Sequence, residues 1–358
     1  MYALWYALLA FMLTVYVILD GFDFGAGILH LFIAKSDRER RTVLAAIGPV
    51  WDGNEVWLVA FGGTLVFAFP RAYATAFSGF YLPLMMVLWL LVLRGVAIEF
   101  RSLEENPLWR SFWDAVFALA SAVLALVLGV ALGNVLRGVP IDRAGWFQAP
   151  LFASEGRTGA IDAYTVLVGL FALVALGAHG ALYLNWKTAG PVGERSARAA
   201  RVLLALTIAL GIATTLATHA VRPALYERLL ARPWSGAFAA AIAGGLLAAI
   251  AGLRRRRELG AFLGSSALLA GLLGATAAGL YPTLLPSTID GRYSVTAPSA
   301  ATGEHGLLVG LAWWVPAVLL SIGYFGYLFR SFAGKVSPDG AGDGVGDGAR
   351  ETAGTPPA

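Results

Sequence analysis

Residues 49–58 read Pro-Val-Trp-Asp-Gly-Asn-Glu-Val-Trp-Leu, and they lead directly into an apolar run at residues 59–69. The carboxylates of this stretch, Asp52 and Glu55, and the amide of Asn54 therefore stand at the start of a segment that is apolar enough to enter a membrane. Ionisable groups at membrane depth are costly and are usually kept for a task. Whether the run is a membrane span, and what the task is, depends on the rest of the chain.

The composition is that of a membrane protein. Of the 358 residues, 58% are hydrophobic and 13% are charged, whereas a soluble domain carries roughly 25% charged residues. The chain has no cysteine, which excludes disulfides, thiolate metal sites and cysteine-linked haem. The net charge of +4 suits loops that face a negatively charged leaflet and gives no indication of a nucleic-acid partner.

The apolar segments predict an all-α, polytopic transmembrane helical bundle of about nine spans. Lys and Arg are concentrated in the first, third, fifth and seventh loops, so the positive-inside rule places the N-terminus outside and the C-terminus in the cytoplasm. We expect residues 1–332 to form the membrane domain and the Gly-, Asp-, Ala- and Pro-rich residues 333–358 to form a disordered cytoplasmic tail. The expected spans are residues 3–33, 46–69, 72–99, 110–136, 161–187, 199–220, 234–253, 259–281 and 305–330.

A weak internal echo relates the two halves of the chain. Residues 37–48 and residues 194–205 both carry a charged run followed by small and aliphatic residues. Two tandem four-helix bundles plus one further helix would explain this echo. A loop-to-helix composition that is common to membrane proteins explains it equally well.

Carboxylates collect in the cytoplasmic half of the first two spans. Asp20 and Asp23 are three residues apart in the first span, as are Asp52 and Glu55 in the second, so each pair lies on one helix face. A one-sided set of carboxylates is what a proton path from the cytoplasm needs. For Asp20 and Asp23, a buried structural network is an equally good interpretation. For Asp52 a functional role is favoured, because no Lys or Arg lies within one helical turn of it.

Further charged residues gather near the same side of the membrane, at the end of the third span and the start of the fourth. For these residues we favour salt bridges that fix helix ends over a proton role. They are Arg94, Glu99, Arg101, Arg110 and Asp114.

The four histidines do not suggest a haem or metal site. His30 and His179 fall on the same side of the membrane, but His30 lies at a helix end beside a basic loop, and His219 and His305 lie toward the other side. Haem ligation by two histidines needs a facing pair at matching depth. We therefore expect satisfied interfacial histidines rather than ligands, and no metal site in this chain.

Five motifs, in order along the chain, resemble those of subunit II of the cytochrome bd-type quinol oxidases. The joint match covers residues 20 to about 330 and is far more specific than any one motif. The motifs are Asp20-Gly21-Phe22-Asp23, the stretch at residues 49–58, Ala76-Phe77-Ser78-Gly79-Phe80-Tyr81, Gly133-Asn134-Val135-Leu136 with Gly138-Val139-Pro140, and Tyr281-Pro282 with Pro286-Ser287.

The resemblance implies a multi-pass subunit of the bacterial cytoplasmic (inner) membrane that is paired with a larger, haem-bearing subunit I. Together the subunits would oxidise quinol, reduce dioxygen to water and generate a proton-motive force, and this subunit would not be active alone. The haems, of b and d type, would be held by subunit I, so no cofactor is expected to be bound firmly here. Small accessory subunits, a bound quinone and bound membrane lipid all stay open.

The resemblance also implies a proton path through this subunit. That role falls to Asp52, with Trp57 beside it, and to Asp23. The spacing of the carboxylates adds Asp20 to the candidates, whereas Asn54 and Glu55 are undecided between packing and proton traffic. Val50 stands where some members carry a histidine, and other members carry glutamine in place of Glu55. Two other classes compete with the oxidase: a proton-coupled secondary transporter that uses the same carboxylates, and a purely structural membrane scaffold.

Overall fold

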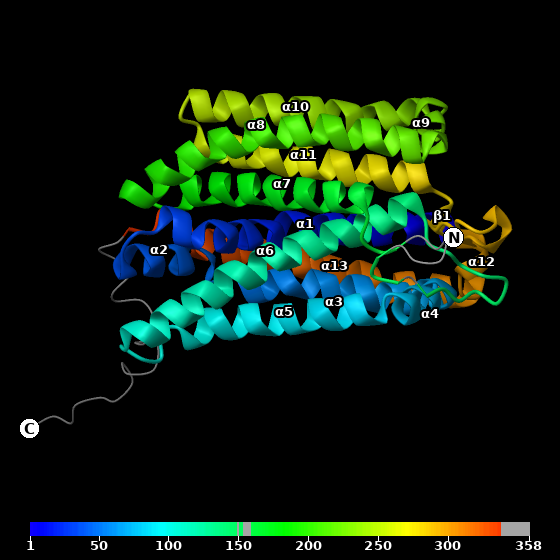
Figure 1. The fold of residues 1–358 in the computed structure, drawn as a ribbon, viewed down its shortest axis with the longest axis horizontal. Coiled ribbons are helices and arrows are strands. Elements are labelled where there is room, and N and C mark those ends of the chain that lie inside the picture. Colours follow the sequence, from blue (N-terminus) through cyan, green and yellow to red (C-terminus); the bar gives the residue numbers. More distant parts are fainter. Residues whose placement is uncertain (149, 153–158, 338–358) are drawn as a thin grey trace, which may run out of the picture.

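The computed structural model describes residues 1–148, 150–152 and 159–337, and it is built almost wholly of helices (Figure 1). Eight helices of the described chain are long and apolar enough to cross a membrane. They are α1 (Tyr2–Ile33), α5 (Tyr81–Phe100), α6 (Pro107–Arg137), α7 (Ala163–Lys187), α8 (Gly190–Val221), α10 (Gly236–Arg254), α11 (Glu258–Leu280) and α13 (Glu304–Ser331).

The remaining elements are shorter. α3 (Trp51–Ala68) runs alongside the long helices but begins with three polar side chains, which lower its mean hydropathy. The strands β1 (Thr283–Leu285) and β2 (Val295–Thr296) form an antiparallel pair in which Thr283 lies opposite Thr296. The other elements are α2 (Asp37–Ile47), α4 (Pro70–Gly79), α9 (Pro223–Leu230), α12 (Ala297–Ala300) and the 3₁₀ turns η1 (Pro233–Ser235) and η2 (Gly291–Tyr293).

The predicted all-α membrane fold is confirmed, but two of the expected spans are divided. The span expected at 46–69 starts only at Trp51, because α2 ends at Ile47 and Pro49 has no N–H to continue the helical hydrogen bonds. The span expected at 72–99 breaks at Phe80 into α4 and α5. Pro83 lacks the N–H that would bond to the Gly79 carbonyl, so one continuous helix is disfavoured. The exact number of spans stays a prediction.

The helices form two groups around α1. α3, α5 and α6 lie on one side of α1, with α13 beside α3, and α7, α8, α10 and α11 lie on the other side (Figure 1). α1 contacts members of both groups. In chain order, α1, α3, α5 and α6 are followed by α7, α8, α10 and α11, with α13 as a further helix, which is the arrangement expected of two tandem four-helix bundles plus one helix.

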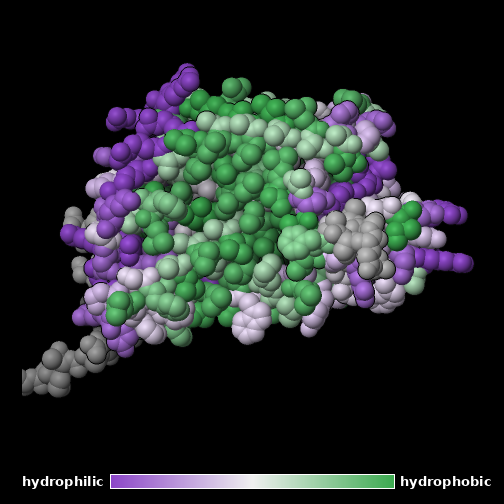
Figure 2. Space-filling view, viewed as in Figure 1, coloured by the Kyte–Doolittle hydropathy of each residue, from purple (hydrophilic) through white to green (hydrophobic). Residues whose placement is uncertain are grey.

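On the face that Figure 2 shows, hydrophobic residues form a belt across the middle of the molecule, and hydrophilic residues gather at its two ends. One end carries α2, and the other carries β1 and α12 next to the N-terminus (Figure 1). The membrane therefore covers the belt. The assignment of the α2 end to the cytoplasm rests on the distribution of Lys and Arg and stays a prediction. Of the expected disordered tail, residues 338–358 lie outside the described residues.

α1 and α7 cross in close contact at two glycines. A Cβ atom on Gly25 would lie 2.6 Å from the Cα atom of Gly180, which is closer than non-bonded atoms approach. Small residues at such crossings let helix backbones touch, which is the main source of packing energy between helices in lipid. The close contact between α1 and α7 therefore depends on Gly25 and Gly180.

We expect Gly25→Ala to lower the stability of the assembled protein by about 1–3 kcal/mol, because the added methyl group forces α1 and α7 apart. Gly244→Ala is the matched control, since a Cβ at Gly244 of α10 meets no atom within 4 Å. The measurement is thermal unfolding in detergent micelles. Equal unfolding midpoints for the two variants would show that the crossing tolerates a side chain.

Candidate functional site

A cluster of charged side chains lies inside the helix group formed by α1, α3 and α5. The Nη2 atom of Arg94, from α5, lies 2.7 Å from Oδ1 of Asp20, from α1, and both side chains are fully buried. The same Nη2 atom donates a hydrogen bond to Glu55 of α3. The guanidinium also lies over the ring of Phe24, 4.4 Å from its centroid. Arg94 therefore joins three helices.

Asn54 connects this cluster to the second carboxylate of α1. Its Nδ2 atom donates to Oδ2 of Asp23 at 2.7 Å and to the carbonyl oxygen of Leu19 at 3.3 Å. Asn54 and Asp23 are both fully buried. Asn54 thus bonds directly to a buried carboxylate, which places it inside the cluster rather than in apolar packing.

The cluster holds more acidic groups than cations. Asp20, Asp23 and Glu55 face the single guanidinium of Arg94. Within the described chain, Oδ1 of Asp23, Oη of Tyr16 and Nε of Arg94 are buried and have no hydrogen-bond partner. Such a set of donors and acceptors at membrane depth can accept and pass on protons. Tyr16, four residues before Asp20 on the same helix face, had no sequence motif to identify it.

Asp52 and Trp57 lie outside this buried cluster. Asp52 is exposed on the surface of α3, and it makes no ion pair with any residue that the structure describes. Trp57 is buried, with its ring 6.3 Å from that of Phe11 and 6.2 Å from that of Phe325 of α13. The stretch at 49–58 therefore has an inner face, with Asn54 and Glu55, and an outer face, with Asp52.

A second charged cluster lies at the α2 end of the molecule around Asp114 of α6. Asp114 accepts hydrogen bonds from Nε of Arg101 at 2.6 Å and from Nη1 of Arg40 at 2.9 Å. Its Oδ1 atom also lies 2.6 Å from Nε2 of the buried His30. Arg101 reaches on to Asp37 of α2 at 2.7 Å. These contacts tie α2 to the ends of α1, α5 and α6.

The residues expected to form ion pairs at helix ends thus have different surroundings in the structure. Arg101 and Asp114 pair with each other, and Arg110 pairs with Asp37 at 3.1 Å. Arg94 belongs instead to the carboxylate cluster. Glu99 is exposed and forms no ion pair within the described chain.

The buried histidines do not fit haem ligation. Nδ1 of His179 lies 2.7 Å from Oγ of Ser265, and its Nε2 lies 2.9 Å from the carbonyl oxygen of Ile18, so both ring nitrogens are engaged. His30 is held by Asp114 in the other cluster. Within the described residues, no group of three or more His, Cys, Asp and Glu side chains is arranged to hold a metal ion.

A large apolar cavity of about 660 Å³ lies between the two helix groups. Its walls come mainly from α6, α7, α8, α10 and α11, and Ala239 of α10 stands at an exposed part of the wall. The few polar residues in its lining include Tyr16 and Thr214. The walls of the cavity are therefore mainly apolar.

The fold and the cluster define a class: polytopic helical membrane proteins that keep ionisable groups at membrane depth. The sequence matches the family described as cytochrome bd terminal oxidase subunit II over residues 1–332. The chain belongs to this family. It is accordingly a multi-pass protein of the bacterial cytoplasmic membrane.

Individual relatives agree with the family assignment. The chain is 37% identical over 205 residues to cytochrome bd-I ubiquinol oxidase subunit 2 of Escherichia coli, a match that covers 57% of this chain and 54%, about half, of that relative. It is 30% identical over 308 residues to cytochrome bd ubiquinol oxidase subunit 2 of Bacillus subtilis, which covers 86% of this chain and 88% of that protein.

A solved structure shares the fold. The bd oxidase of Geobacillus thermodenitrificans contains a chain that superposes with a TM-score of 0.75 at 20% identity. The superposition covers 92% of this chain and 98% of the other.

We expect Arg94→Gln to lower the free energy of unfolding by about 3–5 kcal/mol, because the buried carboxylates lose the one cation that pairs with them among the described residues. Adding Asp20→Asn should recover part of the loss. Arg292→Gln is the control, because the Arg292 side chain is 84% exposed. Unfolding of the purified protein in micelles measures all three. If Arg94→Gln and Arg292→Gln unfold alike, the cluster does not depend on the guanidinium.

Proposed function

We propose that this chain is the second subunit of a membrane-bound quinol:dioxygen oxidoreductase and lines a proton-uptake path from the cytoplasm. A larger subunit I would hold the b- and d-type haems, where quinol is oxidised and dioxygen is reduced to water, and this chain would have no activity alone. Membership of the subunit II family carries the proposal. The engaged ring nitrogens of His179 support the placement of the haems in the partner.

The face formed by α3 and α13 is the best candidate for the contact with subunit I. A Cβ atom on Gly62 or Gly63 of α3, or on Gly323 or Gly326 of α13, would meet no atom of the described chain within 4 Å. Small residues on a membrane-facing surface allow close approach of a further helix. Asp52 is exposed on the same helix as Gly62 and Gly63, so the docked partner can receive protons from it. Small accessory subunits and lipid would cover other parts of the belt.

The two faces of the stretch at 49–58 suggest how protons move. Asp52 lies at the surface, and Asn54 and Glu55 lead inward to the carboxylates of α1. A proton that arrives from the cytoplasm can be held by the buried cluster and transferred at the Asp52 surface. Trp57 packs behind this turn and fixes its position.

The proton-coupled transporter remains the alternative use of the same carboxylates. A transporter of that kind usually carries discontinuous helices at the midplane. α1 and α13 each run as one helix through the membrane. A reduced-minus-oxidised spectrum of the complex from its native membrane separates the two functions. Absence of b- and d-type haem and of a larger subunit would rule out the oxidase.

Asp52→Asn should reduce quinol oxidase turnover by about tenfold or more, because the amide cannot take up or release the proton. The haem spectrum should be unchanged. Asp290→Asn is the control, since Asp290 lies in the segment between the β-strands, near the opposite end of the molecule. Normal turnover in the Asp52 variant would remove this residue from the path, and lost haem would indicate an assembly defect instead.

The apolar cavity provides room for a membrane amphiphile, either quinone or lipid. The lining is mainly apolar and contains one charged side chain, Arg232, so it suits a quinone, which is uncharged, better than a phospholipid with a charged headgroup.

Ala239→Trp should displace the bound quinone by filling the exposed part of the cavity wall. Ala240→Trp is the matched control, because the neighbouring side chain is exposed and does not line the cavity. Solvent extraction and mass spectrometry of the purified complexes measure quinone and phospholipid per haem. The quinone should fall by more than about half only in the Ala239 variant. Loss of phospholipid alone would assign the cavity to lipid, and equal contents in both variants would exclude it as the binding site.

A further inference from the structure

The five residues that follow α13, Phe332 to Val336, form a strap across the α2 end of the molecule. The N–H of Val336 donates to the carbonyl oxygen of Lys187 at 2.7 Å, and the N–H of Ala189 donates to the carbonyl oxygen of Val336 at 2.9 Å. The strap therefore pairs like a short strand with the connection between α7 and α8. α13 lies beside the first helix group, so the strap links it to the second group.

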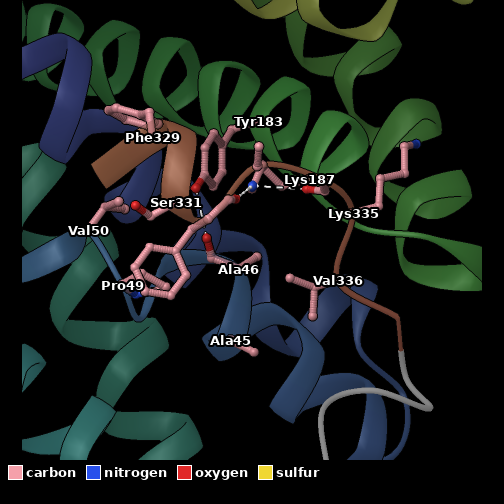
Figure 3. A pocket seen from close by; sticks show the side chains of 13 residues that line it. Ala45, Ala46, Pro49, Val50, Tyr183, Lys187, Phe329, Ser331, Lys335 and Val336 are labelled. Atoms are coloured by element: carbon pink, nitrogen blue, oxygen red, sulfur yellow. Dashed lines mark hydrogen bonds between the residues drawn. The ribbon is translucent and has the colours of Figure 1, made fainter. Parts of the chain in front are cut away.

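Lys187, at the end of α7, binds the strap through its side chain. Its Nζ atom donates to the carbonyl oxygens of Phe332 at 2.6 Å and Gly334 at 3.0 Å, as Figure 3 shows. Lys187 is only 6% exposed, and it forms no ion pair with any carboxylate of the described chain. Carbonyl groups at a helix C-terminus lack partners within the helix and carry partial negative charge. The ammonium group of Lys187, which belongs to α7, thus caps the C-terminus of α13.

A second lysine extends the strap to a third element. The Nζ atom of Lys335 lies 2.6 Å from Glu258, at the start of α11, and donates to the carbonyl oxygen of Asn185 at 3.3 Å. In Figure 3 its side chain points away from Lys187. This ion pair is 41% exposed on the lysine side, so it contributes less than the buried contact of Lys187.

α13 is only weakly packed against the other described helices, so the contacts of the strap matter for its position. Only 11% of its membrane-crossing window is buried. Near its start, Nε1 of Trp5 donates to the carbonyl oxygen of Leu307 at 3.1 Å. Near its other end, the rings of Tyr324 and Phe325 lie over Gly53, where an added Cβ would meet them at 3.7 Å and 3.6 Å. Gly53 belongs to the same helical turn as Asp52.

We propose that the strap and Lys187 position the C-terminal half of α13 against the first turn of α3, and so set the surroundings of Asp52. The strap also closes one side of a cavity of about 240 Å³, whose opposite wall includes Pro49 and Val50 at the start of the same stretch (Figure 3). Lys187 is thus a positioning residue that acts through α13. The inference rests on the proposed function, because it takes Asp52 to be a proton-transfer group.

Hydrogen–deuterium exchange of the whole complex in lipid nanodiscs tests the strap without any substitution. The amides of Val336 and Ala189 should exchange at least about tenfold more slowly than amides of an unstructured chain, because both donate to carbonyl groups. Exchange at the unstructured rate would overturn the strap. This result is independent of Asp52, whose substitution by Asn tests the proton path.

Lys187→Met tests the positioning role, with Lys335→Met as the matched control. We expect Lys187→Met to speed exchange by about tenfold in residues 324–331 and in the first turn of α3, and to change the pH profile of quinol oxidation. Lys187→Arg should retain both properties, and Lys335→Met should stay within about twofold of the unmodified complex. Faster exchange in α13 with an unchanged α3 turn and pH profile would overturn the proposal, as would a Lys187→Met complex that behaves like the control.

Discussion

The pairing of Arg94 with carboxylates from two other helices is the constraint on which the first helix group depends. Removing a charged group from water costs several kcal/mol unless a partner of opposite charge and hydrogen bonds replace the solvent. Asp20 and Arg94 are both fully buried, so neither helix can rotate or withdraw without leaving a charge unpaired. α1, α3 and α5 are therefore fixed in one rotational setting, and Asn54 meets Asp23 as a consequence.

The same constraint explains the sequence of α1 between residues 20 and 27. The carboxylates must face α3 and α5, which leaves the opposite face for α7. Gly21 and Gly25 occupy that face, where Leu176 and Gly180 of α7 approach too closely for a side chain. α1 thus has one charged face and one glycine face, and it can hold two helix groups together only because both occur in the same turns.

Much of this organisation can be predicted from the sequence. Apolar length identifies the spans, and a spacing of three places Asp20 with Asp23 on one face. The sequence does not identify the ion-pair partner of Arg94. The choice between Glu99 and the distant Asp20 depends on how α5 is rotated against α1. The break at Phe80 depends on one missing N–H at Pro83, within a run that is otherwise helical. The burial of His30 depends on α2, whose charged residues look like an ordinary solvated loop.

The exposure of Asp52 shows why the chain is best understood as part of a larger assembly. A helix turns about 100° per residue, so Asp52 and Asn54 point about 200° apart, and a stretch that buries Asn54 turns Asp52 outward. In an isolated subunit that carboxylate would face lipid, where a charge is disfavoured. The open glycines on α3 and α13 lie where a neighbouring helix could exclude that lipid. A buried cluster with more carboxylates than cations and an exposed carboxylate that needs a cover fit the proposed division of labour, in which this chain would handle protons and the partner electrons.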